Sequence, residues 1–97
     1  MNSTEPSPIQ VRNNAAESRF EAEVDGQLAV ADYVVEGDRI TFTHTFVPAA
    51  LRGRGIAEKL VRAALDYARA EKRKVVPACS YVAAFVERHA DYKPLLG

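Results

Sequence analysis

The amino-acid sequence predicts an α+β domain built on a mixed β-sheet. Three observations support this fold class. Residues 18–47 alternate between apolar and polar side chains and are interrupted twice by turn-forming pairs, which is typical of an antiparallel meander. Residues 54–72 instead carry apolar side chains at helical spacing. A short apolar stretch and a second helical pattern follow, so the predicted order of elements is β-β-β-α-β-α.

The length and composition indicate one domain with a small core. The chain has 97 residues, of which 47% are hydrophobic and 27% are charged. It contains no run of about 18 apolar residues and no signal-peptide pattern, so we expect a soluble, cytoplasmic protein without a membrane partner. Cys79 is the single cysteine and there are only two histidines. We therefore expect no internal disulfide and no metal site.

Charge is distributed unevenly along the chain, although the net charge is zero. Residues 1–51 carry 3 basic and 8 acidic side chains, whereas residues 52–97 carry 10 basic and 5 acidic ones. A local positive field attracts anions such as phosphates. The alternative interpretation is that these cations form a solvated helix face.

The first half of the chain predicts three antiparallel strands. Residues 1–16 are rich in Ser, Thr, Pro and Asn and are expected to form a flexible N-terminal segment, with residues 17–97 as the single domain. A strand begins at Ser18, and Asp25-Gly26 predicts a tight hairpin into a second strand over Gln27–Glu36. Gly37-Asp38 predicts the next turn.

The third predicted strand covers Arg39–Val47. Strict alternation would place four side chains on one face of this strand, namely those of Ile40, Phe42, His44 and Phe46. The intervening threonines would occupy the other face. Pro48 ends the strand because proline cannot donate to a sheet ladder.

The second half predicts a long helix, a short strand and a shorter helix. The long helix begins near Arg54 and carries an apolar stripe that includes Leu60 and Tyr67. Lys74–Ala78 reads as a strand and Tyr81–His89 as the second helix, followed by a tail. A strand, a crossover helix and a further strand favour parallel pairing with a right-handed connection.

A glycine turn joins the third strand to the long helix, within the stretch "PAALRGRGIAEKL". Gly53 and Gly55 permit unusual backbone angles and close approach of a ligand. The first N–H groups of the helix lack intrahelical partners, and Arg52 and Arg54 add positive charge, so the turn suits a pyrophosphate. The Walker phosphate-loop motif is absent, and Glu58 stands where a dinucleotide fingerprint has its third glycine. The alternative is a helix start that needs only a flexible backbone.

The motif from Arg52 to Ala57 resembles the acetyl-CoA motif of the GNAT superfamily, Arg/Gln-x-x-Gly-x-Gly/Ala. The longer string "THTFVPAALRGRGIAEKLVRAALDYARAEKRKVVPACSYVAAFVERHADY" is similar to a compact GNAT-like subfamily. It contains a His-x-x-Val segment, the glycine turn, a Pro-x-Cys segment and a terminal Arg-His-x-x-Tyr. The resemblance covers residues 18–96 and implies a truncated GNAT fold with acetyl-CoA as the cofactor.

The resemblance also implies which positions contact the cofactor. Backbone N–H groups of the glycine turn would hold the pyrophosphate, and they belong to Arg52, Gly53, Arg54, Gly55, Ile56 and Ala57. In GNAT domains the strand before the turn splays away from the next strand, and its free edge pairs with the pantetheine arm. Here that edge would be Thr45, Phe46 and Val47, facing Pro77 and Ala78.

Two features depart from the GNAT pattern. Larger members insert helices between their first two strands, whereas Asp25-Gly26 joins those strands directly. We therefore expect an open acceptor side, suited to an extended or protein-borne acceptor. The usual tyrosine general acid would fall near Val86, and neither Tyr81 nor Tyr92 is a clear replacement.

Cys79 and His44 are the candidate catalytic residues. Cys79 precedes a helix, whose dipole can lower the pKa of a thiol and make it a nucleophile; the alternative is a small buried apolar residue. His44 could act as a base toward an amine or toward the thiol, or it could be a core histidine. His89, near a helix C-terminus, is interpreted as a cap or tail contact.

The leading functional hypothesis is a GNAT-like N-acetyltransferase that transfers acetyl from acetyl-CoA to an amine or a protein acceptor. The alternative is a non-catalytic acyl-CoA-binding module, motivated by the missing tyrosine and the open acceptor side. Nucleic acid is not an expected partner, because exposed interleaved aromatics and a recognised binding motif are lacking.

Overall fold

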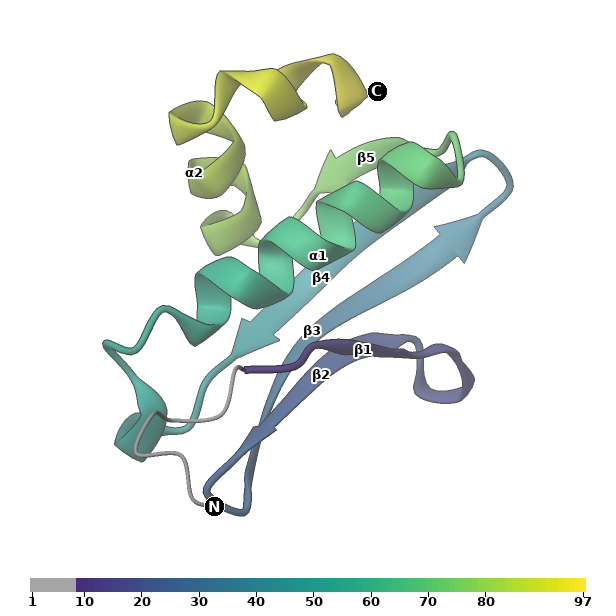
Figure 1. Ribbon diagram of the computed structural model, residues 1–97. Helices are drawn as coiled ribbons and strands as arrows, with labels where there is room; N and C mark the ends of the chain where they lie inside the picture. The colour runs from purple at the N-terminus through teal and green to yellow at the C-terminus, as the bar shows by residue number, and fades with distance from the viewer. Residues whose placement is uncertain (1–8) are drawn as a thin grey trace, which may run out of the picture.

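The computed structural model describes residues 9–97 and contains one five-stranded sheet in the order β1-β2-β3-β4-β5 (Figure 1). Its strands are β1 (Arg12–Asn14), β2 (Arg19–Val24), β3 (Gln27–Glu36), β4 (Arg39–Phe46) and β5 (Lys74–Pro77). The α-helices are α1 (Ile56–Ala70) and α2 (Ser80–Arg88), and the 3-10 helices are η1 (Ala15–Glu17), η2 (Ala49–Leu51) and η3 (Ala90–Leu95). The predicted α+β class, the mixed sheet and the element order from β2 to α2 are confirmed.

The first strand was not predicted from the sequence. Arg12–Asn14 pairs antiparallel with the start of β2, although these residues fall within the segment 1–16 that the composition predicts to be flexible. The stretch is polar throughout and shows no alternation, so it carries no local strand signal. The remainder of that segment, residues 1–8, lies outside the described residues.

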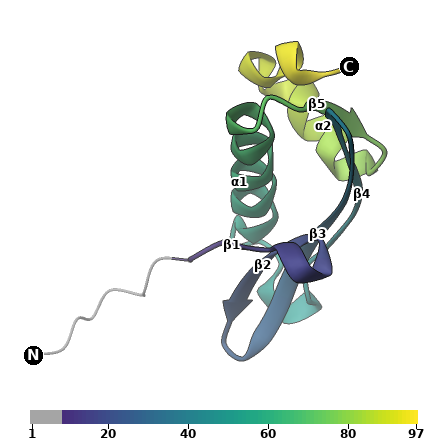
Figure 2. The same ribbon diagram turned by 90° about the vertical axis from the view of Figure 1, so that its right-hand side faces the viewer.

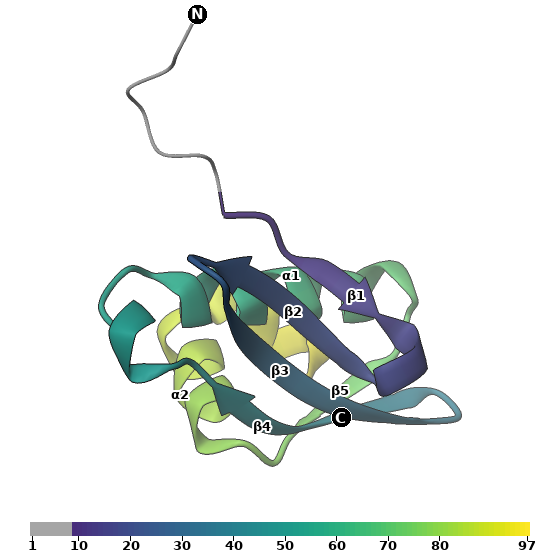
Figure 3. The same ribbon diagram turned by 90° about the horizontal axis from the view of Figure 1, so that it is seen from below.

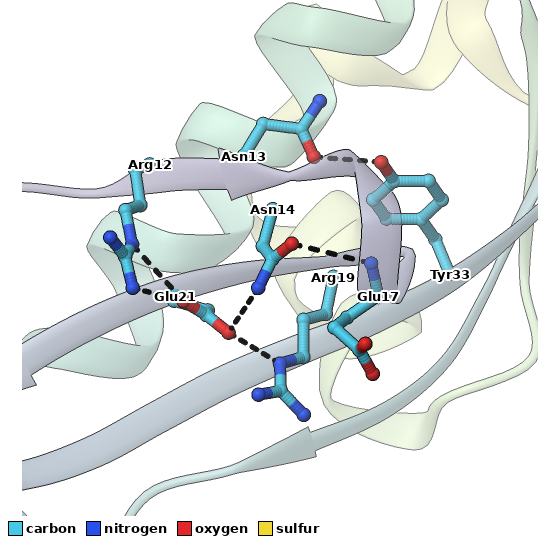
Figure 4. Close-up of polar contacts among 7 residues, drawn as sticks. All are labelled: Arg12, Asn13, Asn14, Glu17, Arg19, Glu21 and Tyr33. Carbon is cyan, nitrogen blue, oxygen red and sulfur yellow. Dashed lines mark hydrogen bonds and ion pairs between the residues drawn. The ribbon is translucent and has the colours of Figure 1, made fainter.

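A buried carboxylate anchors β1 to the sheet (Figure 4). Glu21 on β2 is only 2% exposed. Arg12 donates to Oε1 at 2.7 and 3.1 Å, Asn14 donates to Oε2 at 3.0 Å, and Arg19 also donates to Oε2. The bond from Arg19, with further bonds from Asn14 and Arg12, outweighs burial and lowers the pKa of Glu21 to about 2. Two residues of β1 thus satisfy a carboxylate that the sequence pattern places on the solvent face.

α1 and α2 contact each other on one side of the sheet, and α1 stands clear of the strands in Figure 2. α1 packs across β2 and β3, and α2 and η3 pack beside it near β4 and β5. The buried face of α1 confirms the predicted apolar stripe and comprises Ile56, Leu60, Val61, Ala64, Leu65 and Ala68. The facing positions of the sheet include Ala22, Ala29 and Ala31, whose small side chains leave room for the helix. Aromatic rings complete the core, with Phe20 packing at 5.6 Å from Tyr33.

The other side of the sheet carries none of the described helices, and β2 and β3 lie in front of α1 and α2 in this view (Figure 3). Val34 is 48% exposed and Phe46 is 46% exposed. Within residues 9–97, no helix combines the length and apolar character needed to cross a membrane.

Candidate functional site

A gap opens between β4 and β5 where their pairing stops. The parallel register runs from Arg39 opposite Lys74 to Phe42 opposite Pro77. Pro77 has no N–H to donate, and the chain then turns into α2, with the Cys79 N–H bonded to the Phe42 carbonyl at 2.8 Å. The last residues of β4 pair with β3 alone among the described strands. The predicted edge of Thr45, Phe46 and Val47 lies at this end of β4.

A β-bulge at Thr43 reverses the faces of β4. Phe42 lies opposite Tyr33 and His44 lies opposite Asp32, so Thr43 is the extra residue between the two pairs. Because successive side chains point to opposite faces, one extra residue moves every following side chain to the other face.

The face predicted for the second half of β4 is therefore wrong. Alternation in the sequence places His44 and Phe46 on the core face, whereas both side chains are exposed in the structure. Thr45 points instead toward the helices, and its hydroxyl lies 3.4 Å from Cys79 Sγ. The run from Arg39 to Phe46 alternates without interruption, so nothing local in the sequence indicates the bulge.

The Cys79 thiol sits at the mouth of the gap, immediately before α2. It is half-buried, and burial alone would raise its pKa. The Thr45 hydroxyl and the backbone N–H groups of Val82, Tyr81 and Thr45 stabilise the thiolate more strongly, so the pKa of Cys79 lies below its ordinary value. The side chain that contacts the sulfur is Thr45 and not His44.

The glycine turn leads into the N-terminus of α1. Gly53 and Gly55 have φ of +85° and +76°, in the left-handed region that favours glycine. A Cβ at either position would meet no atom within 4 Å, so the space around the turn is open. The first helical bond runs from the Lys59 N–H to the Gly55 carbonyl at 3.2 Å. The N–H groups of residues 56–58 precede it and lie at the positive end of the helix dipole.

A depression of about 280 Å³ joins the glycine turn to the edge of β4. Its lining includes Val47, the residue after β4, and Tyr81 from α2. The remaining lining residues are Leu51, Arg52, Gly53, Gly55, Ile56, Ala57 and Glu58. Of the predicted edge Thr45–Val47, only Val47 lines the depression, together with every predicted residue of the glycine turn except Arg54.

The charges around this depression differ from those that the sequence suggests. Arg52 lines it, but Arg54 does not, and the Arg54 guanidinium bonds to Asp25 at 2.9 Å. Glu58 also lines the depression and accepts a hydrogen bond from Arg62 at 3.1 Å. An anion here would be held mainly by backbone N–H groups and Arg52.

The tyrosines of the C-terminal region have different surroundings. Val86, which falls at the position of the usual general acid, is 1% exposed and belongs to the core. The Tyr92 hydroxyl is engaged, because it donates to Asp66 at 2.8 Å. Tyr81 lines the depression, and burial raises its pKa, so its phenol keeps its proton at neutral pH. Its position in the sequence, one and a half turns before Val86, did not indicate this placement.

His89 has a structural role. Its Nδ1 lies 2.8 Å from the Phe85 carbonyl, and its ring stacks on Phe85 at 4.0 Å. This agrees with the predicted cap contact. Within the part of the chain that the structure describes, no group of three His, Cys, Asp or Glu side chains could hold a metal ion.

Comparison with known proteins identifies relatives of the chain. A family model of GCN5-related N-acetyl-transferases matches residues 19–95. Protein NATD1 from Gallus gallus is 39% identical over 85 residues, which cover 84% of this chain and 77% of that protein. Protein NATD1 from Homo sapiens is 38% identical over 85 residues, covering 84% and 75%.

A solved structure also matches the fold. The solution NMR structure of a GCN5-like protein from Staphylococcus aureus superimposes with a TM-score of 0.73 at 26% identity. The match covers 95% of this chain and 91% of the other. Together these similarities confirm the resemblance to a compact GNAT-like subfamily and the truncated form of its fold. The chain therefore belongs to the GCN5-related N-acetyltransferase family.

Proposed function

We propose that this domain binds acetyl-CoA and transfers its acetyl group to an amine. One observation carries the proposal: the glycine turn and Val47, which follows the end of β4 that does not pair with β5, border the same depression. The first offers backbone donors for phosphates and the second offers a strand edge for an extended, amide-containing chain.

The residues present fit this cofactor. The turn from Arg52 to Ala57 would hold the pyrophosphate, since its two glycines leave the surrounding space open. The edge from Thr45 to Val47 would bind the pantetheine arm as an added strand. When bound, acetyl-CoA supplies an acetyl thioester, and the chain's own groups orient it and manage the protons.

Cys79 is the candidate nucleophile in this proposal. Its lowered pKa increases the fraction of thiolate, and its Sγ lies at the mouth of the gap between β4 and β5. The Cys79 thiolate would attack the acetyl carbonyl and form an acetyl-Cys79 thioester as the bond to the CoA sulfur breaks and CoA leaves as a thiol. The amine would then attack this thioester, lose a proton and become an amide, while Cys79 leaves as its thiol, with no oxidant or reductant required. Mass spectrometry during turnover should detect an acetyl mass on the protein that Cys79→Ala lacks. Full activity in Cys79→Ala would instead favour direct transfer to the amine.

His44 is the candidate base for the amine. Its side chain is exposed, and it lies opposite Asp32 on the face that carries no helix. In this proposal it would meet an amine that approaches from this side, whereas the Cys79 thiol lies toward the other face. His44→Gln should lower the transfer rate and leave the affinity for acetyl-CoA unchanged, and an unchanged rate would exclude this role.

The open face also bears on the acceptor. Asp25-Gly26 connects β2 to β3 directly, so no inserted helix walls the face on which His44 lies. An uncovered sheet face suits an extended or protein-borne amine better than a small amine that needs an enclosing site. Acetyl transfer should therefore be tested first on a panel of lysine-containing peptides.

Calorimetry with acetyl-CoA tests the binding step. The native protein should bind, and Gly55→Trp should not, because an indole at the turn would fill the space that the pyrophosphate requires. Gly37→Trp is the matched control, since Gly37 also has a positive φ and open surroundings but lies in the turn between β3 and β4. Equal affinity in all three proteins would contradict the cofactor assignment.

A second candidate function is a non-catalytic acyl-CoA-binding module. The observation that favours it is the burial of Val86, which leaves no phenol at the usual position of the general acid. Saturable acetyl-CoA binding without transfer to any peptide would support this module. Transfer to one peptide, lost in Gly55→Trp, would support the enzyme.

A further inference from the structure

A second pocket lies at the end of α1 that is far from the glycine turn. Its volume is about 210 Å³, and it is formed by the last turn of α1, the start of β5 and η3. The residues that line it are Arg69, Lys72, Arg73, Lys74, Pro94 and Leu95. α1 contains 15 residues and is therefore about 22 Å long at 1.5 Å per residue. The pocket is thus separate from the proposed acetyl-CoA site.

Every charged side chain that lines this pocket is cationic. Arg69 is partly neutralised, because its guanidinium lies 3.8 Å from Asp66 and donates to the Asp91 carbonyl at 3.0 Å. Among the described residues, neither Lys72 nor Lys74 has a carboxylate within 4 Å. Cations gathered around a concave surface repel one another and create a local field that favours an anion.

Arg73 supplies an independent observation. Its Nε donates to the Gly37 carbonyl at 3.4 Å, and its Nη1 lies 3.6 Å from Glu71. Within residues 9–97, Nη1 is buried and has no hydrogen-bond partner. Buried donors in proteins almost always have a partner. Arg73 lines the pocket and the Glu71 carboxylate compensates only part of its charge, so its guanidinium retains a donor that an oxyanion could accept.

We propose that this pocket binds a phosphate group, either as free phosphate or on a phosphorylated side chain. Arginine offers a planar fork to an oxyanion, and lysines add point charges. Pro94 and Leu95 provide an apolar wall for the carbon chain of a phosphorylated residue. This inference does not depend on acetyl-CoA binding.

Amide NMR spectra of the whole protein can test the site. Sodium phosphate, a phosphoserine peptide and the same peptide without phosphate would be titrated at constant ionic strength, because phosphate contacts are sensitive to salt. We expect saturable shifts at residues 69–74 and near Leu95. Tighter binding of the phosphopeptide than of phosphate would identify a phosphorylated chain as the source, and equal binding would identify free phosphate.

Charge variants make the test specific. Lys72→Gly suits the local backbone, because φ at Lys72 is +57°, and Lys74→Gln alters an exposed side chain. Each should weaken phosphate binding about fivefold, the loss expected for one unit charge at 4 Å in water. Arg73→Lys keeps the charge but removes the fork and should also weaken binding. Lys59→Gln, near the start of α1, is the control and should change nothing at this pocket.

Three results would overturn the proposal. Shifts that rise linearly with phosphate and never saturate would exclude a site. Equal weakening in Lys59→Gln would show a general charge effect. Equal binding of the peptide with and without its phosphate would show that the phosphate group is not recognised.

Discussion

Replacing Gly55 by alanine should weaken both the fold and acetyl-CoA binding, through the backbone alone. Gly55 has φ of +76°, and a Cβ there would meet no atom within 4 Å. Steric overlap with neighbours therefore contributes nothing, and the cost is that of holding an L-residue in the left-handed region. That cost is about 1–2 kcal/mol per residue.

This backbone cost determines the expected change in both Tm and the affinity for acetyl-CoA. A loss of 1 kcal/mol lowers Tm by roughly 4–8 °C in a domain of this size, so Gly55→Ala should lower Tm by roughly 4–16 °C. If the altered turn leaves the left-handed region to relieve strain, ligand binding must restore it. The affinity for acetyl-CoA would then fall by up to roughly 5- to 30-fold, which is the same 1–2 kcal/mol expressed as a ratio.

Gly37→Ala is the matched control for this prediction. Gly37 has φ of +60° and equally open surroundings, but it lies in the turn between β3 and β4. Thermal unfolding should show similar losses in both variants, whereas calorimetry should show weaker acetyl-CoA binding in Gly55→Ala alone. A Gly55→Ala protein with both native Tm and native affinity would refute the strain argument, and equal affinities in the two variants would refute the placement of the pyrophosphate.

Three other substitutions test separate parts of the structure. The pKa of Glu21 is about 2, below its ordinary 4.5, so the ionised side chain stabilises the fold above pH 4.5 and this contribution is lost as the pH falls toward 2. Glu21→Gln should therefore lower the urea midpoint at pH 7 and flatten its dependence on acid; an unchanged midpoint at pH 7 would contradict the role of this carboxylate. Thr45→Val should raise the pKa of Cys79, because it removes the hydroxyl next to the sulfur, and the pH dependence of iodoacetamide alkylation would show it; Thr41→Val should leave that profile unchanged. Leu60→Ala should destabilise the protein by about 2–5 kcal/mol through cavity formation, since Leu60 is fully buried. Denaturant unfolding would measure this loss, and a loss below about 1 kcal/mol would mean that the core repacks to fill the cavity.

Local sequence patterns predicted the parts of the fold that local physics determines. Asp25-Gly26 and Gly37-Asp38 form the two tight turns, and α1 buries the apolar stripe that its spacing predicts. In contrast, β1 depends on Glu21, which lies nine residues after Arg12 in the chain. A polar tripeptide shows no preference for a strand until that buried carboxylate is present to bind it.

The candidate site was predictable to a similar extent. The glycine turn and the end of β4 that does not pair with β5 follow from motif and order, although only Val47 of the predicted edge lines the depression beside the turn. The bulge at Thr43 arises from how β4 pairs with β3, so it could not be read from β4 itself. The bond between Arg54 and Asp25 joins residues 29 positions apart, and for the same reason the sequence did not show that Arg54 is turned away from the depression.

Because of the bulge, neighbouring side chains of β4 point into two different chemical environments. On one side the Thr45 hydroxyl meets the Cys79 sulfur. On the other, the imidazole of His44 stands across from Asp32 at the solvent boundary. Adjacent residues of a single strand therefore present one side chain to the sulfur and the next to the open face, so that each can be substituted without repacking the surroundings of the other.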